Sequence, residues 1–262
     1  GATTTIKKTN NSSIIIALGI SYTGTKSIQD SVSKMNNEKT LWYTGDFDQV
    51  KLNASFKYLK KINTFQTLLQ GFSIENNLFS LNDKKLYDGT ELRPIRNSKG
   101  STALARGFVQ WQLKRVKDFS ISTGIHSQFF FLTNSFAIEP RGNIKWSIKK
   151  NHSLYLGLGL HSQTQPVYIY FNQTKLINNE FGLTNRNLGF TKSLHLISGY
   201  QYSHNGNTYF KADIYYQHVY DIPVEKRESY FSLINIGSDF SLPLVDSLKN
   251  SGTGNNYGIE LT

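Results

Sequence analysis

Apolar and polar residues alternate along most of this chain with a period of two, and residues 136–161 show the pattern most clearly. Over residues 136–148 the even-numbered positions are mainly apolar, whereas Glu139, Arg141 and Lys145 fall between them. Later in the same stretch, leucines alternate with small, polar or aromatic residues. Successive side chains of a strand point to opposite faces, whereas a helix repeats every 3.6 residues. The alternation therefore predicts two strands joined by a short turn.

The same alternation recurs along the whole chain and predicts an all-β protein of about eleven strands. With 262 residues the chain exceeds the usual domain length, but β-barrels and sandwiches of this size occur as one unit. The expected strands are residues 3–8, 14–22, 50–58, 64–78, 102–114, 119–131, 136–148, 153–161, 191–204, 210–220 and 257–261.

The connections between these strands alternate in length. Short turns are expected near residues 9, 60, 117, 150 and 206, the last being the hairpin-type turn Asn205-Gly206-Asn207. Long polar loops are expected at residues 24–48, 79–100, 162–190 and 222–253, with turn signals at Asp88-Gly89 and Arg93-Pro94. This alternation is typical of antiparallel transmembrane β-barrels, which have short periplasmic turns and long extracellular loops. Strands of about 12 residues, tilted by roughly 40°, rise about 30 Å and cross the hydrocarbon layer.

The polar strand faces indicate a wet interior. Glu139, Arg141 and Lys145 lie on one face of a single strand, where they could neither contact lipid cheaply nor form a dry core without partners. We therefore expect this face to line a lumen, and the opposite face, with Ile138 to Ile148 and Leu154 to Leu160, to contact lipid.

Composition is compatible with this arrangement. The hydrophobic fraction is 38% and the mean hydropathy is -0.39, and no apolar run is long enough for a transmembrane helix. A barrel exposes apolar residues to lipid only at alternate positions, so its average hydropathy stays low. The 13% aromatic content suits strands and aromatic girdles, although a soluble sandwich core uses the same residues. The absence of cysteine excludes disulfides and thiolate metal sites within this sequence.

The net charge of +11 could indicate nucleic acid, anionic head groups or an acidic ligand. The basic residues, however, are spread over turns, loops and polar strand faces, and do not gather on one helix or stripe. We therefore expect no nucleic-acid partner.

Five motifs are prominent from Ser101 onward once the strands are placed. They are EPR at 139–141, GLHSQTQP at 159–166, LGFTK at 188–192, YDIPV at 220–224 and GTGNNYGIEL at 252–261. In this order and spacing they resemble the motifs of TonB-dependent outer-membrane receptors, most closely the Bacteroidetes type with a carboxypeptidase-regulatory-like N-terminal domain. Residues 1–100 match mainly in pattern.

The resemblance implies a barrel of 22 strands around an N-terminal plug, located in the cell outer membrane. Such a receptor imports a ligand with energy passed on by TonB, and has no catalytic activity or cofactor. We expect residues 1–262 to form a middle part of this barrel, surrounded by outer-membrane lipid. The plug domain and the barrel C-terminus are absent, so contacts with the plug and TonB would come through the missing part. Two alternatives stay open: a passive channel or structural barrel subunit, and a soluble carbohydrate-binding β-protein.

The candidate ligand- or plug-contacting residues begin with His161, at the end of its strand. Gln163, Gln165, Tyr168 and Tyr170 lie just beyond it, and Pro166 stiffens the chain. Loops on a rigid scaffold often carry binding residues, but this segment could equally anchor the long loop. On the predicted luminal face, Glu139 and Arg141 complete the candidate set. Charged luminal residues, which also include Lys57, Arg106, Lys145, Lys211 and Asp213, could guide an anionic ligand or neutralise one another in pairs.

No metal or catalytic site is expected. The six histidines lie on different strands and turns without the spacing of known metal sites, and if any pair mattered it would be His161 with His195, near the outer ends of consecutive strands. No G-x-S-x-G nucleophile motif occurs. The glycine-rich segment 252–258 lacks the Lys-Ser/Thr ending of a phosphate loop, and we expect a flexible loop that enters a strand.

Overall fold

The fold is a single antiparallel sheet in which each long strand pairs with the next one along the chain. We describe it from a computed structural model, which covers residues 1–9, 11–35, 37–89, 91–115, 118–176, 180–204, 208–236, 245 and 247–262. The strand order is β1-β2-β3-β4-β5-β6-β7-β8-β11-β12-β13, which confirms the expected eleven-stranded sheet. The bounds are β1 (Ala2–Thr9), β2 (Ser12–Val32), β3 (Lys39–Lys61), β4 (Gln66–Tyr87), β5 (Glu91–Arg115), β6 (Phe119–Phe130), β7 (Ser135–Lys149), β8 (His152–Gln163), β11 (Thr191–His204), β12 (Thr208–Glu225) and β13 (Leu248–Leu261).

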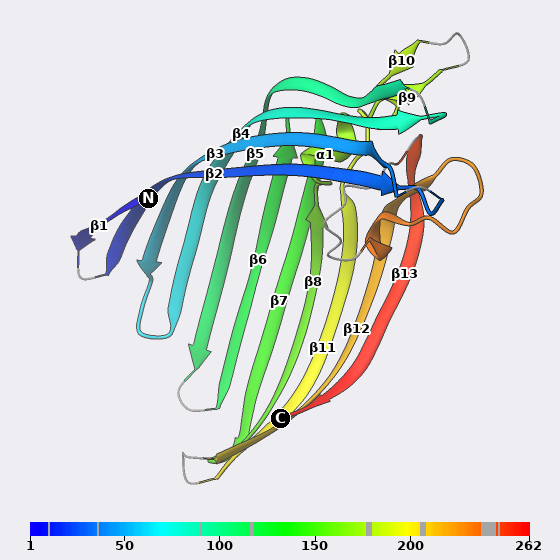
Figure 1. Cartoon of the computed structure of the whole chain (residues 1–262). Helices are drawn as coiled ribbons and strands as arrows, with labels where there is room; N and C mark the ends of the chain where they lie inside the picture. Colours follow the sequence, from blue (N-terminus) through cyan, green and yellow to red (C-terminus); the bar gives the residue numbers. More distant parts are fainter. Residues whose placement is uncertain are drawn as a thin grey trace.

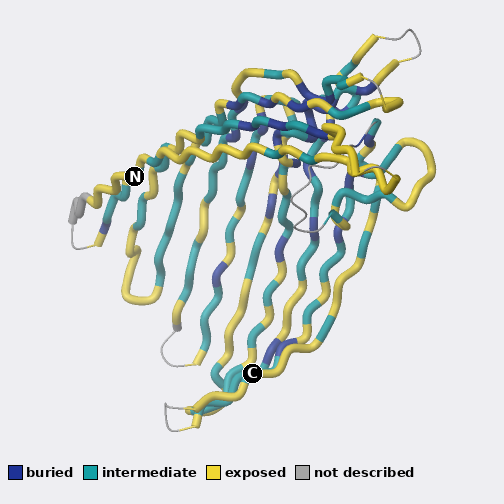
Figure 2. The backbone as a smooth tube through the Cα atoms, viewed as in Figure 1, coloured by how far each residue is buried: buried dark blue, intermediate teal, exposed yellow. Residues whose placement is uncertain are grey.

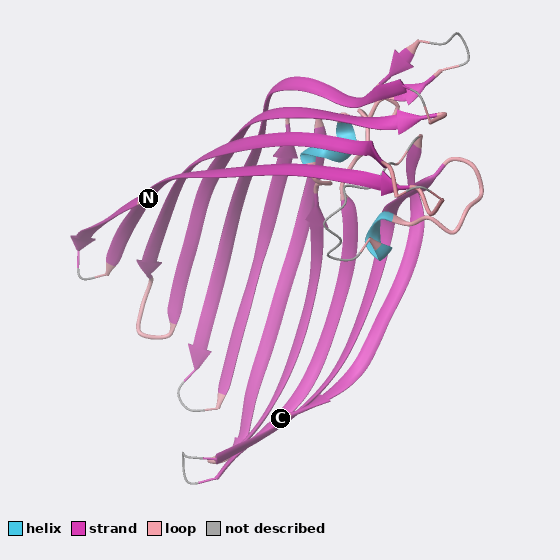
Figure 3. Ribbon diagram, in the orientation of Figure 1, coloured by secondary structure: helices cyan, strands magenta, loops and turns pink. Residues whose placement is uncertain are grey.

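The sheet curves into an open trough with β1 and β13 at its two edges (Figure 1). Smaller elements lie in the connections: α1 (Val167–Tyr170), the paired strands β9 (Thr174–Lys175) and β10 (Phe181–Gly182), and the short 3₁₀ helix η1 (Leu233–Asn235). They gather at one end of the strands, which we call the long-loop end (Figure 3). In the described part of the chain, no helix is long and apolar enough to cross a membrane.

Two of the expected long loops are wrong, because residues 24–48 and 79–100 lie mostly in strands. β2 continues to Val32 and β3 starts at Lys39, whereas β4 continues to Tyr87 and β5 starts at Glu91. On the outer face, where the rest of each strand is apolar, these extensions are mainly polar, as at Lys26, which pairs with Asp46 at 3.3 Å, and Ile28 is an exception. Their buried apolar residues, such as Phe47, Phe79 and Leu81, lie instead on the concave face, so the outward apolar alternation that marks the rest of each strand stops there.

The turn signals had mixed outcomes. Asp88 and Gly89 form a turn with φ of 50° and 71°, as expected. The Arg93-Pro94 prediction is wrong: both residues lie within β5, beside a shift in the β4–β5 register. The expected turn at 205–207 and residues 116–117 lie outside the described residues.

The segment 252–258 is also a strand, contrary to the expected flexible loop, because β13 already starts at Leu248. The expected loop at 222–253 is correspondingly shorter, since β12 continues to Glu225. A side chain at Gly252 would come within 2.6 Å of Val224 Cγ1, so the glycine permits close strand packing there.

The convex outer face carries an apolar belt, as predicted. Registers place its members on the same face, opposite the charged residues Glu139, Arg141 and Lys145. Beyond Tyr22 and Leu78, towards the long-loop end, most outer positions are polar, so the continuous belt covers only part of the longest strands. Exposed residues of the belt include Ile16, Leu18, Ile20, Leu52, Phe56, Phe72, Ile74, Val109, Ile125, Ile138, Ile144, Leu154, Leu156, Leu158, Leu196, Ile214 and Ile259.

The hydrophobic core lies on the concave face at the long-loop end, where buried segments concentrate in Figure 2. Inward side chains of β3 to β7 form its floor, and residues from the connections cover them. The cluster comprises Phe47, Phe79, Leu81, Leu104, Phe130, Ala137, Val167, Ile169, Tyr170, Phe171, Leu188, Phe190, Val245 and Leu248.

Candidate ligand-binding site

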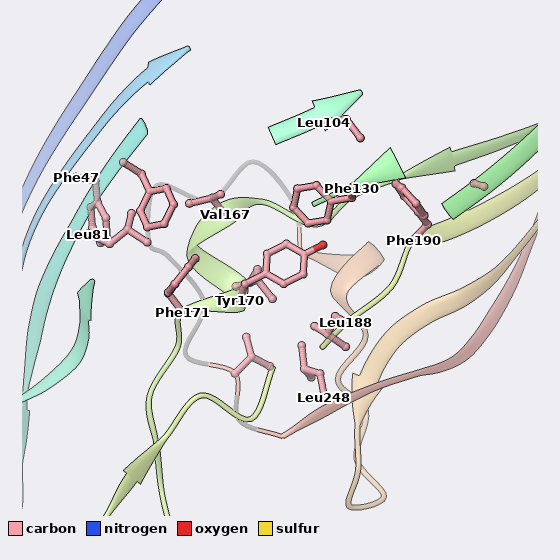
Figure 4. Close-up of a cluster of buried hydrophobic side chains, with 14 residues drawn as sticks. Phe47, Leu81, Leu104, Phe130, Val167, Tyr170, Phe171, Leu188, Phe190 and Leu248 are labelled. Carbon is pink, nitrogen blue, oxygen red and sulfur yellow. The ribbon is translucent and has the colours of Figure 1, made fainter. Parts of the chain in front are cut away.

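We call the described residues of the connection between β8 and β11, 164–176 and 180–190, the inner loop. Its helix α1 and its residues Leu188 and Phe190 pack on the concave face, whereas β9 and β10 extend beyond the strand ends (Figure 1). Its helix α1 starts directly after Pro166 and places Val167, Ile169 and Tyr170 against the strands (Figure 4). Tyr170 is fully buried and its ring lies 5.5 Å from that of Phe130. A four-residue helix is too short to be stable by itself, so this packing holds it in place.

Hydrogen bonds fix the entry segment of the inner loop. Within the loop, the Gln165 backbone N–H donates to the Tyr170 hydroxyl at 3.0 Å. The Gln165 side chain donates from Nε2 to Thr191 Oγ1 on β11 at 2.9 Å. Gln173 N donates to the carbonyl of Ile95, at the irregular position of β5, at 2.8 Å. The entry segment of the inner loop is therefore fixed to both β5 and β11.

The second half of the inner loop is attached to Val245, just before β13, and to the first residues of β13. Asn185, which is fully buried, donates from Nδ2 to Val245 O and accepts from Leu248 N through Oδ1, both at 2.8 Å. Gly189 N donates to Asn250 Oδ1 at 2.9 Å. One asparagine thus supplies both a donor and an acceptor to a neighbouring chain segment, which satisfies its buried amide.

A buried ion pair supports α1 from the side of the long strands, beyond the apolar belt. Arg96 Nη1 lies 2.7 Å from Asp83 Oδ2, and the Tyr43 hydroxyl donates to the same oxygen at 3.0 Å. The guanidinium also lies over the rings of Tyr168 and Phe47, at 5.6 and 5.8 Å. Burial raises the pKa of Asp83 and lowers the pKa of Arg96, and in each case the other partner opposes the shift. Burying the two charges is therefore costly, and removing either residue would leave the other as an uncompensated buried charge.

The wall of the trough has a seam between β7 and β8. Their ladder ends at Arg141↔Gly159, although β7 extends back to Ser135 and β8 continues to Gln163. Glu139 fills the gap and is only 1% exposed. Its carboxylate accepts hydrogen bonds from the Ser162 backbone N–H at 2.9 Å, from the Ser162 hydroxyl and from Arg141.

Gln128 on β6 and Glu139 together replace the backbone hydrogen bonds that β7 and β8 lack beyond Arg141 and Gly159. Gln128 Nε2 donates to the Ser162 carbonyl at 2.8 Å and also to Glu139. The N–H and the C=O of Ser162 thus both find side-chain partners where a strand would otherwise supply them. Glu139 and Gln128 hold the end of β8 in place, just before the chain enters the inner loop.

Below α1, the concave face contains a hollow of about 730 Å³, which we call the loop-end hollow. Its polar side comes from β8, β11 and β12, and its apolar side from the end of β12 and from η1 and its neighbours. The lining residues are His161, Ser162, Gln163, Thr164, Gln165, Pro166, Tyr168, Thr191, Lys192, Ser193, His195, Gln217, Val219, Ile222, Pro223, Leu233, Ile234 and Ile236.

A second hollow of about 460 Å³, the mid-wall hollow, lies next to the first and shares His161 and His195 with it. The centroids of the two imidazole rings are 4.5 Å apart, because the two residues come from the paired strands β8 and β11. His126 and Arg141 also line the mid-wall hollow. Gly159 leaves the space that Arg141 occupies, because a Cβ there would come within 3.3 Å of Arg141 Cγ.

The structure brings most of the candidate residues together. His161, Gln163, Gln165 and Tyr168 line the loop-end hollow, and Arg141 lines the mid-wall hollow. Gln165 is largely engaged in holding the inner loop. The two other candidates are buried in the framework: Glu139 in the seam and Tyr170 in the core.

Sequence reasoning missed the partners that other segments contribute. Ser193 and Gln217 complete the polar side of the loop-end hollow, and Leu233, Ile234 and Ile236 its apolar side. Ser193 and Gln217 occupy inward positions on strands that had been placed, so strand pairing could have located them. The apolar residues lie in a segment without alternation, which carries no such signal.

Arg106, Arg141, Glu139, Lys211 and Asp213 of the luminal charges occur in ion pairs, which agrees for them with the simpler of the two interpretations. Arg106 lies 3.7 Å from Glu75, and Lys211 bonds to Asp213 on the same strand. Among the described residues there is no group of three or more histidine, cysteine or acidic side chains arranged to hold a metal ion.

No protein-family model matches the sequence, and no curated protein matches it. Among solved structures, the ferric enterobactin receptor PfeA from Pseudomonas aeruginosa matches with a TM-score of 0.67 at 14% identity, over 97% of this chain and 39% of that one. The copper transporter OprC matches with a TM-score of 0.63 at 15% identity, over 97% and 41%. The RagAB peptide transporter matches with 0.63 at 14%, over 98% and 32%.

These structures are TonB-dependent receptors. The sheet therefore resembles part of a TonB-dependent receptor barrel. The chain spans about two fifths or less of the length of each matched chain, and at these identities the likeness concerns the fold. It confirms the prediction of an antiparallel barrel segment.

The buried hydroxyl of Tyr170 predicts a loss of stability at alkaline pH. Burial raises the pKa of Tyr170 to about 12, above the value of about 10 in an unfolded chain. Its contribution is therefore complete below pH 10 and is lost as the pH rises through 12, by about 2 kcal/mol at pH 12. Urea unfolding at pH 9 and pH 12 should show this loss in the wild type. Tyr170→Phe should be about 1 kcal/mol less stable at pH 9 and lose less at pH 12, because phenylalanine does not ionise. An equal loss in both proteins would contradict the prediction.

Proposed function

We propose that this chain is part of the barrel of a TonB-dependent outer-membrane receptor and takes part in the import of a ligand, without catalytic activity. The observation that carries the proposal is the match of the whole eleven-stranded sheet to receptor barrels, with a TM-score of 0.67 over 97% of the chain. The apolar outer belt and the polar concave face fit a wall between lipid and a wet lumen. On this proposal the long-loop end is extracellular.

The proposal extends to parts of the receptor beyond this sequence. Residues 1–262 would form a middle portion of a barrel of the 22-strand type, with the plug domain and the TonB contact supplied by other segments. The motifs at 139–141, 159–166 and 252–261 support the Bacteroidetes type with a carboxypeptidase-regulatory-like N-terminal domain. The matched receptors are named for siderophores, copper and peptides, and each of these classes is a possible cargo.

In this proposal the loop-end hollow receives the ligand at the extracellular end of the lumen. His161, Gln163 and Tyr168 would contact it, with Gln165 holding the inner loop beside them. Arg141 would contact the ligand or the plug deeper in the lumen, and Glu139 would act through the seam that positions Ser162. Tyr170 would support the hollow from the core.

Two adjacent positions on β7 test the membrane assignment. The sequence contains no cysteine, so Ile144→Cys on the outer face and Asn143→Cys on the concave face can each carry a single spin label. In the full-length protein in lipid vesicles, we expect the label at 144 to collide with dissolved oxygen and the label at 143 with a water-soluble nickel chelate. Equal access of the nickel chelate to both positions would contradict a lipid-facing belt and favour a soluble β-protein.

Energy dependence separates a receptor from a passive channel. Uptake of the cargo by cells that make the full-length protein should stop when TonB is removed from those cells. Uptake that continues at the same rate without TonB would favour the passive channel.

A further inference from the structure

The two hollows are lined by charges that already have partners. Lys192 Nζ lies 3.0 Å from Asp221 Oδ2, and Arg141 is bonded to Glu139. Among the described residues, no carboxylate lines the loop-end hollow, and Lys192 is its sole Lys or Arg. Among the described residues that line the two hollows, no Lys, Arg, Asp or Glu side chain is therefore left unpaired to bind a multiply charged anion or a cation.

The polar side of the loop-end hollow consists of amides, hydroxyls and imidazoles. Gln163 is exposed at the end of β8. Gln217 Nε2 lies 3.1 Å from Ser193 Oγ and 3.0 Å from His195 Nε2, so β11 and β12 present a connected set of uncharged groups, and Gln163 on β8 lines the same hollow. Side-chain amides both donate and accept hydrogen bonds, which suits a ligand that carries both kinds of group.

The opposite side of the hollow is aliphatic. Ile222 and Val219 come from β12, while Leu233, Ile234 and Ile236 come from η1 and the residue after it. Ile234 is 54% exposed, so apolar surface is open to an occupant. Covering it would remove apolar surface from water, which favours binding.

We propose that the loop-end hollow binds an uncharged peptide segment in extended conformation, which rests on the proposed receptor function. An extended peptide carries backbone N–H and C=O groups for the amide side and places alternate side chains on opposite sides. Its aliphatic side chains would cover Ile234 and Ile236, while its backbone would form hydrogen bonds with Gln163 and Gln217. The volume of about 730 Å³ lies within the usual range of about 300–1,000 Å³ for ligand sites.

Other cargo classes fit this chemistry less well. An iron chelate with several negative charges would bring them to groups without an unpaired cation. An oligosaccharide has no aliphatic side chains to pack against Leu233, Ile234 and Ile236. A sugar ring could stack on an aromatic side chain, but among the described residues Tyr168 is the one tyrosine, tryptophan or phenylalanine that lines the hollow.

Peptide pools of equal length test the proposal. The full-length protein in lipid nanodiscs is incubated with end-capped heptapeptides that are neutral, acidic or basic, and with maltoheptaose and a ferric tris-catecholate. Bound species are then identified by native mass spectrometry. We expect retention of neutral, aliphatic-containing peptides, with affinity reduced roughly tenfold in Gln163→Leu or Gln217→Leu. Gln201→Leu, which makes the same change on the concave face of β11 away from the hollow, should bind as the wild type does.

The outcomes separate the peptide proposal from the receptor proposal. Retention of the chelate or the sugar, weakened by Gln163→Leu or Gln217→Leu, would overturn the peptide proposal and leave the receptor function intact. Retention of the neutral pool with equal losses in all three variants would place the peptide elsewhere and overturn the assignment to this hollow. Retention of the acidic or basic pool in preference to the neutral one would overturn it as well.

Discussion

Replacing Asp83 with leucine is expected to destabilise the long-loop end by about 3–5 kcal/mol, the largest effect that we expect from a single substitution. The variant leaves the Arg96 guanidinium buried without the carboxylate that lies 2.7 Å away, and removes the acceptor of the Tyr43 hydroxyl. Arg96 also lies over the ring of Tyr168, so the loss should spread to α1. The loss of stability is measured by unfolding the full-length protein in denaturant and monitoring how readily a protease cleaves the inner loop.

Two further variants separate charge burial from a general weakening of the strands. The double variant Asp83→Leu/Arg96→Met removes both charges and should recover most of the lost stability, because an apolar pair of similar volume needs no compensation. Glu75→Leu removes a carboxylate that lies 3.7 Å from Arg106 and is 26% exposed, and should cost less than about 1 kcal/mol. A double variant as unstable as Asp83→Leu alone would show that the packing of the side chains, and not their charge, matters at this position.

Glu139→Leu is expected to open the seam between β7 and β8 at a cost of about 3 kcal/mol. The substitution removes the acceptor of the Ser162 N–H and of Arg141, and also leaves Gln128 with one partner fewer, all at a site that is 1% exposed. The end of β8 should then open locally far more often. Hydrogen exchange of a peptide that covers residues 158–164 should accelerate roughly hundredfold.

The conservative variant Glu139→Gln tests whether the carboxylate acts as a substitute for the missing strand. Its amide keeps one acceptor oxygen for Ser162, so exchange in 158–164 should rise less than in Glu139→Leu. Residues 196–202, lower on β11, pair fully with β8 and serve as the internal control, and their exchange should stay unchanged. Unchanged exchange of 158–164 in Glu139→Leu would show that the seam does not depend on this side chain.

These two predictions concern the same feature of the molecule, which is how the inner loop is held on the concave face. The ion pair holds α1 from the side of β4 and β5, whereas the seam holds the end of β8 from which the loop departs. Opening either attachment should displace the polar side of the loop-end hollow. We therefore expect Asp83→Leu and Glu139→Leu to weaken binding at the hollow, although neither residue lines it.

The sequence by itself determined the strands wherever one face is apolar. Leu154 to Leu158 on β8 and Ile138 to Ile144 on β7 lie on the outer face as expected, because backbone geometry sends alternate side chains to opposite faces in any strand. The adjacency of His161 and His195 followed from the same local rule once their strands were placed next to each other.

Only the tertiary structure decided which polar segments are strands and which groups form the site. The extensions of β2 to β5 lose the outward apolar alternation and turn apolar residues such as Phe47 and Leu81 inward, so pairing with neighbouring strands, and not a continued pattern, makes them strands. Glu139 could be recognised as a substitute ladder partner only after the register showed where β7 and β8 separate. The hollow joins Gln163, Gln217 and Ile236, which are far apart in the sequence. Their proximity depends on long-range pairing and on the packing of the inner loop, and a local pattern carries neither.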